Sequence, residues 1–313
     1  MINKKLKVAV LTGGIGTERD VSLQSGQCVT DALREAGVRV VTADIRPDEL
    51  DILQDRSIDI FFPALHGTFG EDGQLQQMLE DRSLLFTGSG SIASKLAFDK
   101  MASKELFEVE GVAVPKAVEF RPESNVELLH QRLYQFSRTY VVKPVREGSS
   151  VGVQMVSTPD EALEAAWKVY NRFGDCMIEE FVPGREVTVS LLGEKTLPII
   201  EIRTRSDFYD YQAKYIDERT EFLFDTITDP AVAARISRAA MDCFAALGCR
   251  HVARVDFILG DDGTAYVLEV NTIPGFTTHS LLPKAAAKAG LPMSDLCANI
   301  VEAAYASLLS RNA

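Results

Sequence analysis

Residues 252–272 read VARVDFILGDDGTAYVLEVNT, a pattern that predicts two strands of alternating apolar residues joined by an Asp-Gly turn. Successive side chains of a strand point to opposite faces, so Arg254 shares a face with Asp256. Glu269 and Asn271 share a face of the second strand in the same way. A two-residue turn without a bulge sets Asp256 directly opposite Glu269, and Arg254 opposite Asn271. Like charges in directly opposite positions destabilise a sheet.

A cation between the two carboxylates would remove this repulsion. Carboxylate and amide oxygens are hard ligands, which suit a Mg²⁺ ion that also holds phosphate oxygens. The alternative is a solvated hairpin in which the two charges simply repel. Because the flanking residues are Val, Phe, Ile and Leu, we expect the hairpin to be half buried. This favours a metal site at Asp256, Glu269 and Asn271.

The whole chain has the composition of a globular protein with more than one core. Its 313 residues predict two or three domains. A net charge of −12 argues against a nucleic-acid or anionic-membrane partner, because both require a basic surface. No apolar run is long enough for a transmembrane helix, and 8–11 is too short for a signal peptide. Five scattered cysteines without a CxxC motif are typical of a reduced, cytoplasmic compartment.

Strands and helices alternate over residues 6–90, which predicts a parallel, wound sheet. Ligands of such sheets bind at the carboxyl ends of the strands, where Gly13-Gly14, Glu18 and His66-Gly67 fall. The elements expected here are strands at 7–11, 38–43, 58–65 and 84–87 and helices at 20–36 and 74–80. The rest of the chain is expected to form helices at 91–109, 159–170, 231–247 and 293–309 and strands at 118–120, 140–143, 177–181, 186–192 and 197–203.

Two later segments have the residues of a nucleotide site. The loop 146–152 follows a strand that ends at Lys143, and its small residues allow backbone N–H groups to approach a phosphate. The alternative is an ordinary hairpin turn. Lys100 is a second candidate phosphate ligand, although most helix lysines are simply solvated. Glu179 and Glu186 suit an adenine edge and ribose hydroxyls, with an acidic linker as the alternative.

The glycines at 13, 14 and 16 follow the first strand but do not give the GxGxxG spacing of a dinucleotide site. Glu18 could instead hold a substrate ammonium group. As a carboxylate at the start of a helix, it also has a plain structural role.

Taken together, these motifs resemble the D-alanine–D-alanine ligase family of the ATP-grasp superfamily, over nearly all of residues 6–308. All of them occur in the order and at the spacing of that family. The matching segments are Gly13–Ser22, Leu65–Gly73, Val142–Gly152, Phe208–Tyr215, Arg254–Asp256 and Glu269–Ser280.

The resemblance implies an α/β fold: an N-terminal wound parallel-sheet (Rossmann-like) domain and two α+β subdomains that grip ATP. The implied domains are 1–97, 98–184 and 185–313, and a lid loop at 206–222 belongs to the last. The implied partners are ATP and D-alanine, with two Mg²⁺ ions that Mn²⁺ can replace and K⁺ as a candidate activator. A cytoplasmic homodimer is implied as well.

The resemblance also assigns residues to the nucleotide. The implied ATP-binding residues are Lys100, Lys143, Ser149, Ser150, Glu179, Glu180, Val182, Glu186 and Lys214. The two metal ions would be held by Asp256, Glu269 and Asn271, in agreement with the hairpin argument.

In the family's reaction, ATP phosphorylates the carboxylate of a first D-alanine, and the amine of a second attacks the acyl phosphate. Glu18 would hold the first ammonium group, with His66 nearby, and Arg254 and the Gly275 N–H would stabilise the oxyanion. Ser280 and Leu281 would bind the second carboxylate.

Glu18, Ser149 and Tyr215 would form a hydrogen-bonded triad. A tyrosine at the position of Tyr215 accompanies D-alanine as second substrate in this family, and a phenylalanine accompanies D-lactate. The sequence therefore predicts D-alanyl-D-alanine formation for peptidoglycan. D-serine or D-lactate as second substrate, or an inactive ATP-binding regulator, remain alternatives.

Overall fold

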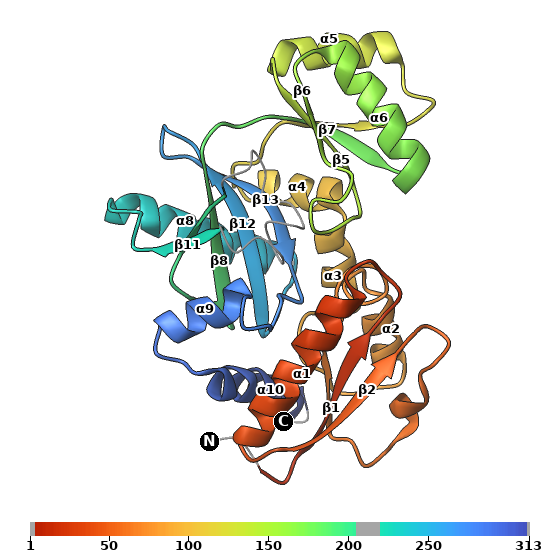
Figure 1. Cartoon of the computed structure of the whole chain (residues 1–313), viewed down its shortest axis with the longest axis vertical. Coiled ribbons are helices and arrows are strands. Elements are labelled where there is room, and N and C mark those ends of the chain that lie inside the picture. Colours follow the sequence, from red (N-terminus) through yellow and green to blue (C-terminus); the bar gives the residue numbers. More distant parts are fainter. Residues whose placement is uncertain (1–3, 205–219, 312–313) are drawn as a thin grey trace.

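The computed structural model describes residues 4–204 and 220–311, and its strands form three separate sheets. Figure 1 shows the sheets one above another along the long axis of the molecule, with the first at the bottom and the second at the top. The third sheet therefore lies between the other two. No helix in the described ranges is both long and apolar enough to cross a lipid bilayer.

The first sheet is parallel, with strand order β2-β1-β3. Its strands are β1 (Lys7–Gly13), β2 (Arg39–Ile45) and β3 (Ile60–Pro63). The expected strand at 84–87 is wrong, because only Phe86 bridges to this sheet, opposite Phe61. Gly88 has a φ of +87° and turns the chain away after this single pairing.

The other two sheets are antiparallel. The second has the order β4-β7-β5-β6 and the third the order β11-β10-β8-β12-β13, with β9 paired to β8. Their strands are β4 (Ala117–Phe120), β5 (Tyr140–Pro144), β6 (Gln154–Val156), β7 (Cys176–Glu180), β8 (Arg185–Leu192), β9 (Lys195–Thr196), β10 (Ile200–Arg203), β11 (Glu221–Phe224), β12 (Val252–Leu259) and β13 (Ala265–Asn271).

Helices cover the sheets and join them. They are α1 (Arg19–Glu35), α2 (Gln74–Asp81), α3 (Ser91–Phe98), α4 (Lys100–Val109), α5 (Val126–Phe136), α6 (Pro159–Phe173), α8 (Pro230–Ala246), α9 (Leu281–Lys288) and α10 (Met293–Arg311), with a 3₁₀ turn η1 (Asp51–Gln54). The last helix returns to the first sheet, where Leu296 and Ile300 share a core with Val29 and Leu33 of α1. Figure 1 shows α10 beside α1.

The hairpin of β12 and β13, called the metal hairpin below, has the expected pairing of residues, but its turn and its register differ from the expectation. Asp256 lies opposite Glu269 and Arg254 opposite Asn271. The turn is one residue longer than expected, because Gly260 N–H bonds the Thr264 carbonyl. A β-bulge after Asp256 then shifts the register back by one residue. The two departures cancel, so the carboxylates meet as predicted.

The expected helix at 91–109 is two helices. Asp99 has a ψ of 100°, so α3 ends before it, and its side chain accepts the Ala102 N–H to cap α4. The other oxygen of Asp99 accepts hydrogen bonds from Arg146 Nε at 2.9 Å and Nη2 at 2.7 Å. This break places Lys100 at the first position of α4, next to the loop 146–152.

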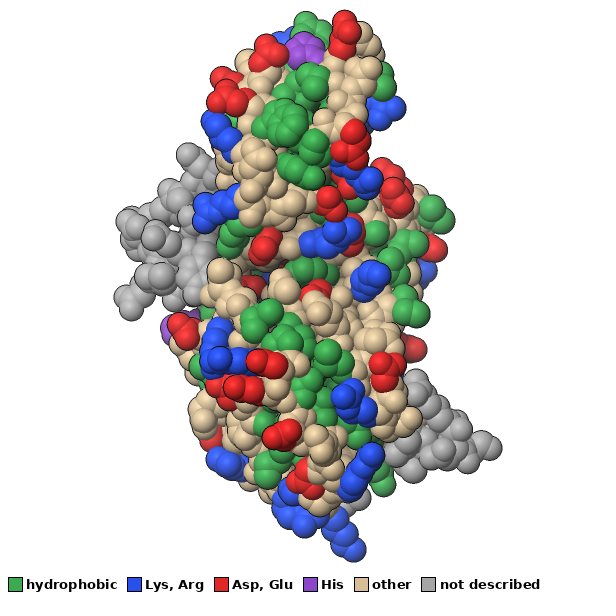
Figure 2. Space-filling view, turned by 90° about the vertical axis from the view of Figure 1, so that its right-hand side faces the viewer, with side chains coloured by type: hydrophobic (Ala, Val, Ile, Leu, Met, Phe, Trp, Pro, Cys, Tyr) green, Lys and Arg blue, Asp and Glu red, His purple; other side chains and the backbone are tan. Residues whose placement is uncertain are grey.

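Two helices, α5 and α9, were not expected from the sequence. The expected lid loop 206–222 is corrected at its end, because Glu221 and Phe222 begin β11, where hydrogen bonds to β10 hold them. On the described part of the face in Figure 2, acidic and basic side chains are interspersed. The domain boundaries at 97/98 and 184/185 stay predictions.

Candidate active site

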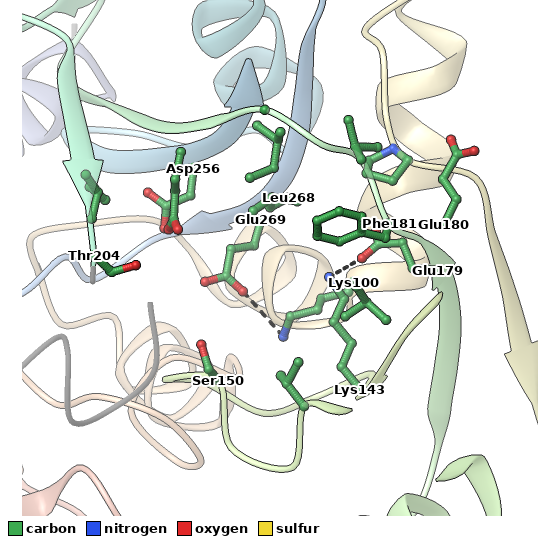
Figure 3. A pocket seen from close by; sticks show the side chains of 18 of the residues that line it. Lys100, Lys143, Ser150, Glu179, Glu180, Phe181, Thr204, Asp256, Leu268 and Glu269 are labelled. Atoms are coloured by element: carbon green, nitrogen blue, oxygen red, sulfur yellow. Dashed lines mark ion pairs between the residues drawn. The ribbon is translucent and has the colours of Figure 1, made fainter. Parts of the chain in front are cut away.

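A cavity of 420 Å³ lies between the second and third sheets (Figure 3). Both lysines of the predicted phosphate site line it, and so do the two carboxylates of the metal hairpin. The predicted residues on its wall are Lys100, Lys143, Ser150, Glu179, Glu180, Val182, Glu186, Asp256 and Glu269. The fold therefore brings together, from six helices and strands and two loops, side chains that the sequence scatters over 170 positions.

Glu179 on β7 is the most enclosed charge of this cavity. Its side chain forms ion pairs with Lys143 at 2.6 Å and with Lys104 at 2.5 Å. Burial alone would raise the pKa of Glu179, but the two lysines outweigh burial and lower it. Lys104 was not singled out in the sequence, where nothing distinguishes it from a solvated helix lysine.

Lys100 connects the loop 146–152 to the metal hairpin. Its Nζ donates a hydrogen bond to the Glu147 carbonyl at 2.5 Å and lies 3.5 Å from Glu269 Oε2. Figure 3 shows this ion pair at the centre of the cavity. Both Lys100 and Lys143 therefore present ammonium groups to the same space.

Asp256 is held by a network that the sequence did not reveal. Arg254 donates to it from Nε at 2.9 Å and Nη2 at 2.8 Å, and Asn271 donates from Nδ2 at 3.0 Å. The Thr188 hydroxyl on β8 donates to Oδ1 at 2.6 Å. In this arrangement Arg254 neutralises Asp256 and Lys100 lies near Glu269, which relieves the repulsion across the hairpin.

One part of the cavity is apolar. Ile202 and Ile258 lie opposite Glu186 on neighbouring strands, so all three share the face that lines the cavity, and Leu268 adjoins them. Phe181 and Val182 close the slot. The Glu180 carboxylate points away from it, because it accepts the Lys116 N–H at 2.9 Å (Figure 3). Apolar walls and one buried carboxylate suit a purine ring with an amino edge.

A second, smaller cavity of 50 Å³ adjoins the first, and Gly148 lines both. It collects the residues predicted to bind the amino-acid substrates. Those on its wall are Glu18, His66, Ser149, Arg254, Asn271, Gly275, Ser280 and Leu281. The Ser149 hydroxyl donates to the Glu18 carboxylate, which joins the loop of the second sheet to the start of α1.

His66 is buried at the base of this cavity. Its Nε2 is 3.1 Å from the Ser25 hydroxyl, and Ser25 in turn accepts the Phe276 N–H at 3.2 Å. Burial lowers the pKa of His66, although the Glu18 charge opposes this shift. The ring is therefore neutral at pH 7 and fixes the segment that follows β13.

Glu71 also lines the smaller cavity, although it is not among the residues predicted from the sequence. Its Oε2 accepts the Gly67 N–H at 2.8 Å. Burial, together with the neighbouring Glu18 charge, raises the pKa of Glu71 to about 8. The sequence could have identified Glu71, because this residue lies within the family-like segment 65–73.

Gly275 and Ser280 pack against each other at the start of α9. A Cβ on Gly275 would lie 2.6 Å from the Ser280 hydroxyl, so any other residue here would displace that side chain. The Ser280 hydroxyl accepts the Thr277 N–H at 3.0 Å. Ser280 N-caps α9, and Leu281 is its first residue, so both lie at a helix terminus that favours an anion.

The loop of Ser149 and Ser150 has an uncommon backbone. Both residues have positive φ values, +51° and +57°, a region that serine rarely adopts. Such strain persists only where the surroundings impose it. Lys214 and Tyr215, assigned to the nucleotide and to the lid, lie outside the described residues.

Two family models match the chain: D-ala D-ala ligase N-terminus over residues 48–89 and D-ala D-ala ligase C-terminus over residues 106–302. A D-alanine–D-alanine ligase of Anaeromyxobacter sp. is 42% identical over 95% of this chain and 96% of its own. The corresponding ligase of Carboxydothermus hydrogenoformans is 40% identical over 95% of this chain and 97% of its own.

Solved structures agree in fold over nearly the full length. The D-alanine–D-alanine ligase from Bacillus anthracis complexed with ATP has a TM-score of 0.86 and 32% identity, covering 99% of this chain and 100% of that one. The VanG D-Ala:D-Ser ligase from Enterococcus faecalis has a TM-score of 0.84 and 28% identity, covering 96% and 99%. The expected ATP-grasp fold is thereby confirmed, and the chain belongs to the D-alanine–D-alanine ligase family.

Proposed function

We propose that this chain joins two D-alanine molecules into D-alanyl-D-alanine at the expense of ATP, for peptidoglycan synthesis. The observation that carries this proposal is the wall shared by the two cavities. Asp256 and Glu269 face the larger cavity, Arg254 and Asn271 face the smaller one, and Gly148 lines both. A phosphoryl group transferred across this wall moves directly from nucleotide to amino acid.

The larger cavity is assigned to ATP. The apolar slot with Glu179 takes the adenine, and Val182 lies along the adenine edge. Glu186 binds the ribose. Lys100 and Lys143 contact the phosphates, and the loop with Ser149 and Ser150 covers them. An ATP complex of a family member with the same fold supports this assignment.

The hairpin has the donor set of a magnesium site. Asp256 and Glu269 both line the ATP cavity, and two carboxylates with the Asn271 amide oxygen would leave coordination positions for phosphate oxygens. Asn271 donates a hydrogen bond from Nδ2 to Asp256, so its side-chain amide must rotate before its oxygen can bind the metal ion. Bound Mg²⁺ ions, or Mn²⁺ in their place, would draw off the negative charge that builds up during phosphoryl transfer.

The smaller cavity is assigned to the amino acids. Glu18 holds the ammonium group of the first D-alanine, beside His66, while a carboxylate oxygen of that D-alanine attacks the γ-phosphorus and ADP leaves. The amine of the second D-alanine then loses a proton and attacks the acyl carbon, and phosphate departs.

Arg254 and the Gly275 N–H stabilise the oxyanion that forms at this carbon, an effect of about 3–4 kcal/mol per donor. Ser280 and Leu281, at the positive end of α9, bind the second carboxylate. Lys214 and Tyr215 are proposed to close the site as part of the lid, and exclusion of water would protect the acyl phosphate. A cytoplasmic homodimer and activation by K⁺ remain predictions.

D-serine is the second candidate for the attacking amino acid. The VanG D-Ala:D-Ser ligase shares this fold at a TM-score of 0.84, so the architecture accommodates a D-Ser-specific relative. One additional hydroxyl discriminates weakly in a pocket that does not exclude it.

The test is ADP release from MgATP with D-alanine, with L-alanine as control, and mass spectrometry of the product. ADP formation that requires D-alanine and yields the dipeptide supports the proposal, and parallel reactions with D-serine and D-lactate define the second substrate. Nucleotide binding without ADP formation would refute it in favour of the regulator.

A further inference from the structure

Lys104 is a buried cation behind the ATP cavity, and none of the roles assigned above includes it. Its side chain extends from α4 and is 5% exposed. Its Nζ lies 2.5 Å from Glu179 Oε1 and donates a hydrogen bond to the Pro115 carbonyl at 3.1 Å. Lys104 does not line either of the two cavities, although Lys143 lines the larger one.

The two lysines bind different oxygens of the same carboxylate. Lys143 pairs with Glu179 Oε2, which leaves Oε1 to Lys104. The two ion pairs therefore hold Glu179 from opposite ends. Figure 3 shows Glu179 and Lys143 together at the adenine end of the cavity.

Binding of a nucleotide would break the Lys143–Glu179 ion pair and leave the Lys104–Glu179 ion pair intact. Lys143 lines the cavity and is assigned to the phosphates, so its ammonium group turns toward them and releases Oε2. Glu179 is 2% exposed, and an ionised carboxylate at such a position cannot lose both countercharges without a large penalty. Lys104 does not line the cavity, so its charge stays with Oε1 when a nucleotide enters.

We propose that Lys104 is a positioning residue that keeps Glu179 as an oriented anion, so that the oxygen released by Lys143 accepts the exocyclic amino group of adenine. This inference rests on the proposed ATP site. Lys104 thereby sets the preference for a purine with an amino group at this edge over one with an oxo group.

The charges around Glu179 support this role. Burial raises the pKa of Glu179, and the two lysines together hold the pKa below its ordinary value. Without Lys104, burial dominates as soon as Lys143 turns away, and the carboxyl takes up a proton. A protonated carboxyl donates a hydrogen bond, which suits the oxo group of hypoxanthine and not the amino group of adenine.

The experiment compares the dissociation constants of MgATP and MgITP by calorimetry, with no amino acid present. Lys104→Met is expected to weaken ATP binding about tenfold or more and to leave ITP binding nearly unchanged, so that the ATP preference falls. Lys168→Met is the matched control, because it removes the same charge from an exposed pair with Glu164. That control should bind both nucleotides as the unmodified chain does.

A second variant separates positioning from general damage to the fold. Lys104→Gln keeps a hydrogen-bond donor without the charge and should show the same loss of ATP preference. It keeps the test possible if Lys104→Met does not fold. In a Glu179→Gln background, which has no charge to stabilise, Lys104→Met should no longer change the ATP-to-ITP ratio. Equal weakening of both nucleotides in the Lys104 variants, or an unchanged ratio, overturns the proposal.

The binding assay is independent of the ligase reaction. If the unmodified chain prefers ATP to ITP but forms no dipeptide, the proposed function is refuted, and the nucleotide preference of the variants still tests the role of Lys104. If the chain forms the dipeptide but the Lys104 variants keep the ATP preference, the proposed function stands and the role of Lys104 is refuted.

Discussion

The Ser149 hydroxyl donates a hydrogen bond to the Glu18 carboxylate across 131 positions of sequence. Glu18 stands at the start of α1 beside the first sheet, and Ser149 lies in the loop that follows β5 of the second sheet. This contact orients the carboxylate assigned to the first ammonium group. It also closes the loop over the wall between the two cavities.

We expect Ser149→Ala to weaken binding of the first D-alanine. A hydrogen bond to a charged group contributes about 1.5–3 kcal/mol, so the KM for the first D-alanine should rise about tenfold or more, with a smaller change in the KM for ATP. Steady-state kinetics with each substrate varied in turn measures this split. A rise in the KM for ATP alone would contradict the assignment of Glu18.

We expect Asp256→Asn to abolish turnover at ordinary magnesium concentrations without unfolding the chain. The amide keeps an oxygen for Arg254 and Thr188 but lacks the charge that a divalent cation requires. ADP release across a magnesium titration, together with thermal unfolding, tests both parts. Full activity at low magnesium would refute the metal assignment of the hairpin.

We expect Glu71 to make the stability of the chain depend on pH. Its pKa is about 8 in the folded state against 4.5 for an ordinary glutamate, so between these values the folded state holds a proton that the unfolded state has released. Stability must then fall as pH rises through this window.

Glu71→Gln is neutral at every pH and keeps an oxygen for the Gly67 N–H. Its stability relative to the unmodified chain should therefore increase from about pH 5 to about pH 8. Urea midpoints at both pH values measure the difference. A difference that does not change with pH would show that folding leaves the pKa of Glu71 at its ordinary value.

We expect Gly275→Ala to lower kcat while the chain still folds. The new methyl group would lie 2.6 Å from the Ser280 hydroxyl, and relief of this clash displaces both the Gly275 N–H and the site of the second carboxylate. A loss of about 100-fold corresponds to misplacement of one oxyanion donor. Gly290→Ala is not a suitable control, because its φ of +78° strains any side chain.

Ser280→Ala tests the same clash from the other side. Removal of the hydroxyl in the Gly275→Ala background makes room for the added methyl group, and part of the lost kcat should return. If the double variant is no better than Gly275→Ala, steric contact with Ser280 is not the cause.

Local sequence patterns predicted most of the elements correctly, and the errors have local causes. The helix 159–173 was found from its Thr158 cap, which accepts the Glu161 N–H. The sequence did not predict the break at Asp99, which the structure shows through its ψ of 100°, its cap on the Ala102 N–H and its contact with Arg146. The hairpin pairing was predicted correctly although its turn and its bulge were not.

The sequence by itself determined the strand periodicity, the small residues of the phosphate loop and the order of motifs that identifies the family, because these depend on neighbours along the chain. Only the tertiary structure decided that Thr188 and Arg254 hold Asp256, that Glu71 joins Glu18, and that Lys104 supports Glu179. In the sequence, Thr188 and Lys104 resemble ordinary strand and helix residues. Burial and a charged partner from a distant segment set these two residues apart, and both are properties of the folded chain alone.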